Sequence, residues 1–255
     1  MIRSKLGLKV LGLCTLALGL MAFASSGVAQ AEAGSRWCYI NPTTLVLQCF
    51  NSLLRPTLQY KLETSLSLLF TTAGGTKVAF TCTAVEMVGE PAFEEEGSIS
   101  EGKAKYTGCK TTLNGGESKN CQPKTKGTAL GTIVTNALRG LIKLHLLTPG
   151  GAVDPVILDT PTVVNGKGET VLATLELGEL CSIGEIVEIV GDITWIDCQN
   201  ELAVHKVEHL IEEFPSLRGL RALGQPATID GSYLMRLVGA HAGYRWAGLP
   251  SPTKP

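Results

Sequence analysis

Hydrophobic residues occupy nearly every second position of the stretch TLQYKLETSLSLLF, residues 57–70, and polar residues fill most of the positions between them. An apolar side chain at every second position lines one face of a strand, so the pattern predicts a long, half-buried β-strand. Beyond a glycine turn, Val78, Phe80, Cys82 and Ala84 line one face of the next predicted strand. Further strands are expected at about 98–108, 109–113, 117–121, 127–135, 139–147, 169–180, 186–190, 193–198 and 227–238.

Glycine and proline residues separate these short segments, as in Pro149-Gly150-Gly151. Many short strands with frequent turn signals predict a mostly β fold, an antiparallel sandwich or a partly closed barrel. Because no linker interrupts the series, we expect one β-rich domain over residues 57–240. A hairpin over residues 34–56 is expected to precede this domain, and a flexible tail over residues 241–255 to follow it.

The segment ELAVHKVEHLIEEF, residues 201–214, departs from the alternation. Its apolar residues recur at the three- and four-residue spacing of a helix face, and Pro215 follows directly. We therefore predict one short C-terminal amphipathic helix over this segment. The apolar residues concerned are Ala203, Val204, Val207, Leu210, Ile211 and Phe214.

This predicted helix contains His205, Glu208 and His209 in the H-x-x-E-H spacing of inverted zinc proteases. Histidines four residues apart could both coordinate zinc, and Glu208 could activate a zinc-bound water. On a helical wheel, however, both histidines lie about 160° from Val207, the centre of the apolar face. An outward face lacks the dry, supported pocket of a catalytic zinc, so a zinc hydrolase is the least favoured reading. We predict no metal, no cofactor and no catalytic residue.

Residues 1–33 have the composition of a secretory signal peptide. Basic residues come first, the uncharged apolar run Val10–Ala24 follows, and small residues end in two overlapping A-x-A patterns. The apolar run is shorter than the roughly 20 residues of a membrane-spanning helix. We expect an exported, extracellular protein with no membrane contact after cleavage.

The balance of basic and acidic residues limits the kinds of partner that the protein can bind. Without Arg3, Lys5, Lys9 and Glu32, the remaining chain has 19 basic and 22 acidic residues. Nucleic-acid-binding domains are usually strongly basic, so this charge balance argues against a nucleic-acid partner. A glutamate-rich stretch at residues 86–96 precedes a lysine-rich one at 103–126. Solvated strand faces explain both stretches, and contact with a charged polymer such as cell wall or glycan is the alternative.

Seven cysteines follow the predicted signal peptide, and disulfides are the default state of exported cysteines. Turn sequences lie midway between Cys38 and Cys49 and between Cys109 and Cys121, so each pair is predicted to close a hairpin. For the rest, Cys82–Cys181 with Cys198 as a free thiol is favoured over Cys181–Cys198. A free Cys198 could also link two chains in a disulfide-bonded dimer. The seven residues are Cys38, Cys49, Cys82, Cys109, Cys121, Cys181 and Cys198.

From about Val78 to Trp195 the chain resembles a large group of uncharacterised exported bacterial proteins. The shared pattern is a strand cysteine, T-G-C, a second cysteine, G-x-I-x-T-x-x-L-x-G, and a later strand cysteine followed by V-x-G. The resemblance implies a secreted β-rich module and supplies no activity or ligand. The matching positions here are Cys82, Thr107-Gly108-Cys109, Cys121, residues 131–140, Cys181 and Val190-Gly191.

The sequence contains neither a G-x-S-x-G nucleophile elbow nor a phosphate-binding G-x-x-x-x-G-K-[ST] loop. The favoured interpretation is a secreted, non-enzymatic β module with a structural or binding role at the cell exterior. The alternative is a secreted hydrolase whose site is assembled from loops. The zinc hydrolase of His205, Glu208 and His209 comes last.

Overall fold

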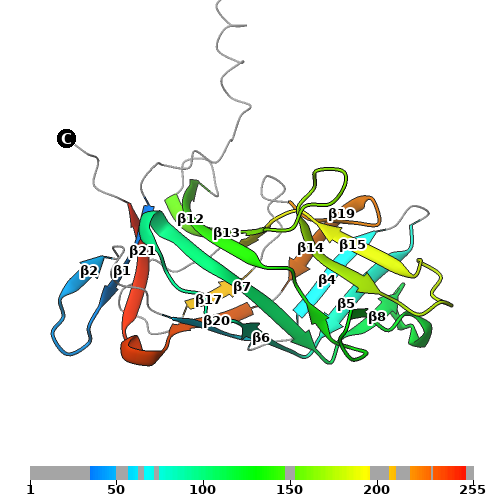
Figure 1. The fold of residues 1–255 in the computed structure, drawn as a ribbon, viewed down its shortest axis with the longest axis horizontal. Coiled ribbons are helices and arrows are strands. Elements are labelled where there is room, and N and C mark those ends of the chain that lie inside the picture. The colour runs from blue at the N-terminus through cyan, green and yellow to red at the C-terminus, as the bar shows by residue number, and fades with distance from the viewer. Residues whose placement is uncertain are drawn as a thin grey trace, which may run out of the picture. The chain divides into compact units, whose positions relative to one another are not determined.

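The alternating sequence pattern folds into antiparallel β-sheets that include a curled half-barrel (Figure 1). The computed structural model describes residues 35–49, 57–62, 66–71, 75–146, 153–195, 207–210, 219–230 and 232–250. These residues lie within one compact unit, Ala31–Pro255. In this described part of the chain, no helix is long and apolar enough to cross a membrane.

Two large sheets and one small sheet contain the described strands. The first has the order β10-β14-β15-β18-β19-β4-β5-β8-β9. Its strands are β4 (Leu66–Thr71), β5 (Lys77–Cys82), β8 (Lys110–Leu113), β9 (Gly116–Glu117), β10 (Lys124–Thr125), β14 (Val171–Glu176), β15 (Ile186–Val190), β18 (Arg221–Ala222) and β19 (Gln225–Asp230).

The second large sheet has the order β16-β13-β12-β7-β6-β3-β20-β17, and β11 also pairs with β7. Its strands are β3 (Leu58–Leu62), β6 (Ala84–Val88), β7 (Ser98–Thr107), β11 (Ile133–Val134), β12 (Leu138–Leu146), β13 (Val153–Pro161), β16 (Ile193–Trp195), β17 (Val207–Leu210) and β20 (Ser232–Leu237). The small sheet consists of β1 (Ser35–Ile40), β2 (Leu47–Cys49) and β21 (Arg245–Pro250). Short 3₁₀ turns are η1 (Glu95–Gly97), η2 (Lys119–Cys121) and η4 (Gly239–His241).

The long strand predicted over residues 57–70 is divided between the two large sheets. Its first part, β3, pairs with β20, and its second part, β4, pairs with β19. The strand predicted over 227–238 is divided in the same way, because β19 and β20 also belong to different sheets. Strands that bend from one sheet into another form the corners of such folds, and side-chain alternation does not reveal the bend.

Four residues of the predicted helix over 201–214 form a strand instead. Val207–Leu210 are β17, which pairs with β20 so that Val207 lies opposite Met235 and Leu210 opposite Ser232. The available edge of β20 offers backbone partners, and such tertiary pairing overrides the local helix preference of a short segment. The other residues of 201–214 lie outside the described part, and a helix there stays a prediction.

Strand β13 was not among the predicted strands, because Pro155 and Pro161 lie within it. Proline cannot donate a backbone hydrogen bond and is rare in central strands. Here β12 pairs with the whole of β13, whereas β16 pairs only with Ile157–Asp159, between the two prolines. Both prolines therefore lie where one edge of β13 has no paired strand among the described residues.

The small sheet carries an aromatic core. Trp37 on β1 stacks on Phe93 with ring centroids 4.1 Å apart, and Trp246 on β21 packs edge-on at 5.3 Å from Trp37. The indole nitrogen of Trp37 donates a 3.0 Å hydrogen bond to the carbonyl oxygen of Ser98. The structure thus differs from the flexible tail expected over 241–255, because residues 245–250 form β21 and Trp246 is buried.

Three disulfides join the six cysteines that were expected to be bonded. Cys38–Cys49 closes the β1–β2 hairpin as predicted, with the two residues directly opposite each other. The other two predicted pairings are wrong, since the structure contains Cys82–Cys109 and Cys121–Cys181.

The register of the β8–β9 hairpin explains why Cys109 and Cys121 form disulfides with other cysteines and not with each other. Its two-residue turn, Asn114-Gly115, pairs Leu113 with Gly116 and Thr112 with Glu117. Continued along both strands, this register misses the pairing of Cys109 with Cys121 by one residue. Strand β5 pairs with β8 so that Thr81 lies opposite Lys110. The next residue of this register places Cys82 beside Cys109, to which it is bonded. The β10–β14 pairing then brings Cys121 close to Cys181.

Candidate functional site

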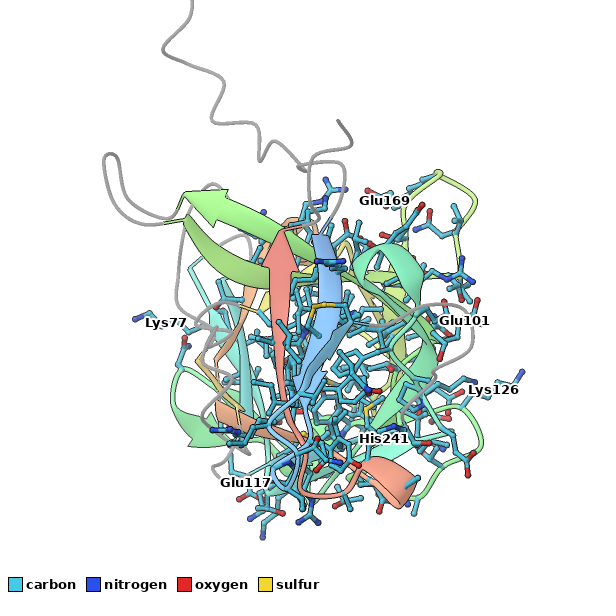
Figure 2. All side chains as sticks on the ribbon, turned by 90° about the vertical axis from the view of Figure 1, so that its left-hand side faces the viewer. Lys77, Glu101, Glu117, Lys126, Glu169 and His241 are labelled. Atoms are coloured by element: carbon cyan, nitrogen blue, oxygen red, sulfur yellow. A yellow bond between two sulfur atoms is a disulfide. The ribbon has the colours of Figure 1, made fainter. Side chains whose placement is uncertain are left out.

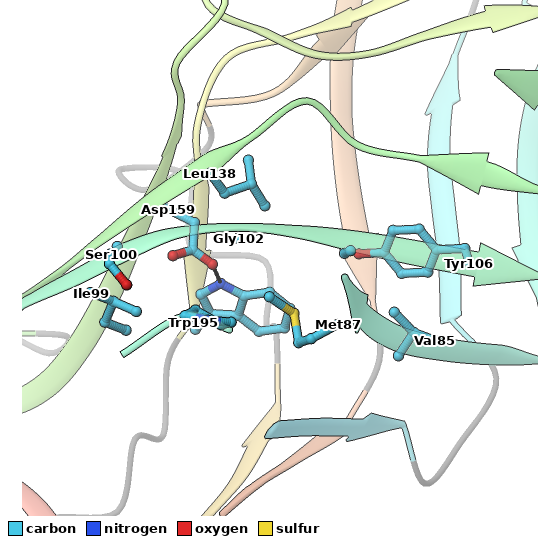
Figure 3. Close-up of a pocket in the computed structure, with 12 residues that line it drawn as sticks. Val85, Met87, Ile99, Ser100, Gly102, Tyr106, Leu138, Asp159 and Trp195 are labelled. Atoms are coloured by element: carbon cyan, nitrogen blue, oxygen red, sulfur yellow. Dashed lines mark hydrogen bonds between the residues drawn. The ribbon is translucent and has the colours of Figure 1, made fainter. Parts of the chain in front are cut away.

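Asp159 on β13 of the second large sheet carries a buried carboxyl group, and only 5% of the residue is exposed. In the neighbouring strand β12, Gly140 lies directly opposite Asp159, and Ile99 of β7 lies opposite Gly140. Trp195 at the end of β16 donates a 2.6 Å hydrogen bond from Nε1 to Oδ2 of Asp159 (Figure 3). Strand pairing thus places the carboxyl and the indole together from opposite ends of the sequence segment 159–195.

The space around Asp159 is a small pocket with mostly apolar walls. About 20 Å³ is accessible to water in it, enough for a water molecule. Sites for drug-sized ligands occupy roughly 300–1,000 Å³, so this pocket is too small for such a ligand. The lining residues are Val85, Met87, Pro91, Ile99, Ser100, Gly102, Ala104, Tyr106, Leu138, Gly140, Asp159 and Trp195.

Two glycines leave room for these side chains. A β-carbon at Gly140 would lie 2.8 Å from Oδ1 of Asp159 and 2.9 Å from Cδ1 of Ile99. At Gly102, a β-carbon would lie 2.8 Å from Cε of Met87. Contacts this short require a shift of the neighbouring atoms, so glycine at both positions preserves the shape of the pocket.

Burial raises the pKa of Asp159 to about 6, and the hydrogen bond from Trp195 offsets part of the rise. Removal from water disfavours the charged carboxylate, whereas a donor pointing at the carboxylate favours it. Asp159 therefore changes its protonation state close to neutral pH. Among the described residues that line the pocket, the only other titratable side chain is that of Tyr106, and none supplies a second carboxyl for acid–base chemistry.

A second hollow is open and large enough for a small ligand. It encloses about 400 Å³ on the surface of the first large sheet. We call it the β15 groove. Strand β15 pairs with β18 only at Ile189 and Val190, and the Leu223-Gly224 turn then carries the chain into β19. The lining residues are Lys167, Glu169, Ile186, Val187, Glu188, Val190, Arg221, Ala222, Leu223 and Gly224.

Asn165 organises the polar end of the β15 groove. Its Oδ1 accepts hydrogen bonds from the backbone N–H groups of Lys167, at 2.9 Å, and Glu169, at 3.1 Å. This side chain therefore closes the β13–β14 turn, as asparagine does in Asx-turns. Its Nδ2 donates to Oε2 of Glu169 and to Oε2 of Glu188, both at 3.3 Å. One amide group thus holds two carboxylates close together.

Some charged side chains of the groove form an ion pair and others do not. Glu169 forms an ion pair with Arg221 through Oε1, and it lies at the outside of the β-structure in Figure 2. Glu188 has the amide of Asn165 as its hydrogen-bond donor and no cationic partner among the described residues. Lys167 likewise forms no ion pair within the described part of the chain. The groove thus presents one uncompensated carboxylate and one uncompensated ammonium group.

The residues predicted from sequence do not assemble at either hollow. Cys198 and His205 lie outside the described residues, so the free thiol, the interchain disulfide and the zinc arrangement stay predictions. Glu208 and His209 belong to strand β17. In the part of the chain that the structure describes, no group of three or more His, Cys, Asp or Glu side chains could hold a metal ion.

Sequence reasoning missed Asp159, Asn165 and the charged residues of the groove. The signal for Asp159 was a single acidic residue within the apolar run PVILD, which the flanking prolines obscured. The signal for Asn165 was the turn sequence NGKG. The proximity of Glu169, Glu188 and Arg221 depends on pairing among β14, β15 and β18, and one sequence does not show which strands are neighbours.

Comparison with known proteins gives no match to a family model, to a curated protein or to a solved structure.

Proposed function

We propose that this protein is a non-enzymatic binding module of the cell exterior and that its ligand occupies the β15 groove. The observation that carries the proposal is the contrast between the two hollows. The groove has the volume of a ligand site and lies open on a sheet surface, whereas the pocket around the buried carboxyl has room only for water.

Location at the cell exterior is supported by the covalent structure. The described residues contain three intramolecular disulfides, which are consistent with an extracellular protein because cytosolic thiols are kept reduced. The signal-peptide composition of residues 1–33 supports the same location. In this proposal, the protein is secreted and the natural partner is a polymer at the cell exterior, cell wall or glycan.

A binding assay with insoluble cell-wall material tests this function. Wild-type protein is expected to sediment with the material, and Arg221→Ala is expected to weaken this retention, because Arg221 lines the groove and its loss leaves the carboxylate of Glu169 without an ion pair. Lys110→Ala is the matched control, because Lys110 forms a surface ion pair with Glu117 at 3.0 Å in another hairpin. Retention unchanged in Arg221→Ala, or absent in wild type, would contradict the proposal.

One observation favours a secreted hydrolase as the second candidate. Glu169 and Glu188 both accept a hydrogen bond from the same Asn165 nitrogen, and glycosidases act through a pair of nearby carboxyl groups. One carboxyl of such a pair must be protonated, which enzymes achieve by burial in an apolar environment. Here Glu169 is paired with Arg221 and Glu188 is exposed, so neither carboxyl lies in the buried, apolar environment that such an acid requires, and binding is favoured over hydrolysis.

Release of soluble sugar fragments from the same cell-wall material separates the two candidates. The binding module is expected to release none during prolonged incubation. Fragment release that disappears in Glu188→Gln, with folding intact by circular dichroism, would establish the hydrolase instead.

A further inference from the structure

We infer that the β15 groove binds a dipolar ligand, a small molecule or chain end that carries both a cationic and an anionic group. The inference rests on the proposed function, because it assigns a ligand class to the same groove. It follows from the two uncompensated charges of the groove, Glu188 and Lys167, and from the fixed structure between them.

Glu188 supplies the site for the cationic group. Its position is defined on β15, where it lies opposite Thr174 of β14, and the amide of Asn165 orients its carboxylate. The nearest charged neighbour on that amide is another carboxylate, Glu169. Two carboxylates held close together attract a cation, and Arg221 compensates only Glu169.

Lys167 supplies the site for the anionic group. Its backbone N–H is fixed by Oδ1 of Asn165 at 2.9 Å, so the base of the side chain is anchored to the same turn. Lys167 is solvent-exposed and has no ion pair among the described residues. It can therefore swing over the groove towards a carboxylate or phosphate without breaking an existing pair.

The four charged side chains of the groove sum to zero, two basic and two acidic. A purely anionic or purely cationic ligand would face like charge as well as opposite charge, which costs binding free energy. A ligand with one charge of each sign faces both uncompensated groups favourably. Ile186, which is 57% exposed, adds apolar surface for the hydrocarbon part of such a ligand.

A series of glycine peptides tests the ligand class directly. Diglycine, triglycine and tetraglycine carry one ammonium and one carboxylate at increasing separation, and NMR titration of the whole protein measures their binding. We expect at least one of them to bind. N-acetylation, which removes the cation, and C-terminal amidation, which removes the anion, should each weaken binding about three- to fivefold. That factor follows from the worth of an exposed ion pair, up to about 1 kcal/mol.

Two charge-neutral variants assign the two ends of the ligand. Glu188→Gln should bind the free peptide three- to fivefold more weakly and should no longer distinguish it from the N-acetylated form. Lys167→Gln should also bind the free peptide three- to fivefold more weakly, and it should no longer distinguish the free peptide from the C-terminal amide. Glu101→Gln and Lys126→Gln remove exposed charges elsewhere (Figure 2) and should leave all affinities unchanged.

Equal binding of free and blocked peptides, or no binding of any glycine peptide, would overturn the dipolar ligand. The proposed function would survive that result if Arg221→Ala still weakened cell-wall retention. Conversely, peptide binding with the expected pattern but no cell-wall retention would leave the dipolar ligand in place and refute the proposed partner.

Discussion

The carboxylate of Asp159 accepts a 2.6 Å hydrogen bond from the indole Nε1 of Trp195 within an apolar pocket of the second large sheet. This contact joins β13 to the end of β16 and compensates a charge that burial disfavours. A hydrogen bond to a charged group contributes about 1.5–3 kcal/mol, more than one between neutral groups. The stability of this sheet is therefore coupled to the protonation of one residue.

Stability is expected to fall as the pH rises from about 4 to about 6. In the folded protein the pKa of Asp159 is about 6, whereas the pKa of an aspartate in the unfolded chain is about 3.9. In this window the folded state binds more protons, so rising pH lowers the free energy of unfolding by up to about 3 kcal/mol. Urea unfolding at pH 4.5 and pH 7.5 measures the difference.

Asp159→Asn should remove this contribution from the pH profile, because the amide does not titrate. Asp192→Asn is the matched control, since Asp192 is partly buried and its carboxylate accepts a long hydrogen bond, 3.4 Å, from Thr170. The control variant should retain the wild-type slope. A slope that persists in Asp159→Asn would show that other groups cause it.

Replacing Trp195 by phenylalanine should destabilise the protein more at pH 8 than at pH 5, by about 1 kcal/mol. At pH 8 the lost donor leaves an ionised carboxylate unpaired, and at pH 5 it leaves a neutral acid unpaired. Trp246→Phe is the control, because the buried Nε1 of Trp246 has no hydrogen-bond partner among the described residues. Urea unfolding followed by circular dichroism should give the control the same cost at both pH values. Equal costs for Trp195→Phe would refute the coupling.

Gly140→Ala should cost about 1–3 kcal/mol of unfolding free energy. The new methyl group would meet Oδ1 of Asp159 and Cδ1 of Ile99 at less than 3.0 Å. Gly166→Ala provides the comparison, because a β-carbon at Gly166 meets no atom within 4 Å. Its free energy of unfolding, measured in urea, should stay within about 0.5 kcal/mol of that of wild type. Equal effects of the two substitutions would mean that the pocket is not packed as described.

The disulfide connectivity predicts unequal contributions to stability. Cys121–Cys181 spans 60 residues and Cys38–Cys49 spans 11, and restriction of the unfolded chain grows with loop length. Double substitution to alanine should cost about 4 kcal/mol for the longer loop and about 3 kcal/mol for the shorter one. Thermal unfolding of the two variants measures the order, and a larger loss for Cys38–Cys49 would contradict it.

Peptide mapping without reduction tests the connectivity itself. Proteolytic peptides that contain Cys82 should be linked to those that contain Cys109. A peptide that links Cys109 to Cys121 would instead support the pairing predicted from the symmetric turn and would require a different register for the β8–β9 hairpin.

Much of the fold could be predicted from side-chain alternation. The strand predicted over 98–108 is β7, and the one over 186–190 is β15. Alternation reports which face of a strand is buried but not which strand lies beside it. The exchange of cysteine partners shows the consequence, because a difference of one residue in the turn at Asn114-Gly115 removes Cys121 from the position opposite Cys109.

The candidate site could be predicted far less well, for the same physical reason. Asp159 and Trp195 are adjacent only because β13 pairs with β16, and Glu169 meets Arg221 only because β14, β15 and β18 are neighbours in one sheet. These contacts join residues 36 and 52 positions apart. Helical spacing, in contrast, misled the prediction at Val207–Leu210, where pairing with β20 decides the conformation.

Chemical-shift mapping with a soluble cell-wall fragment tests the central claim, that the protein binds its partner in the β15 groove without consuming it. In a titration of isotope-labelled protein, the largest shifts should fall on residues 165–169, 186–190 and 221–224, and the fragment's own spectrum should stay unchanged. Shifts concentrated on another surface, or conversion of the fragment during the titration, would contradict the claim.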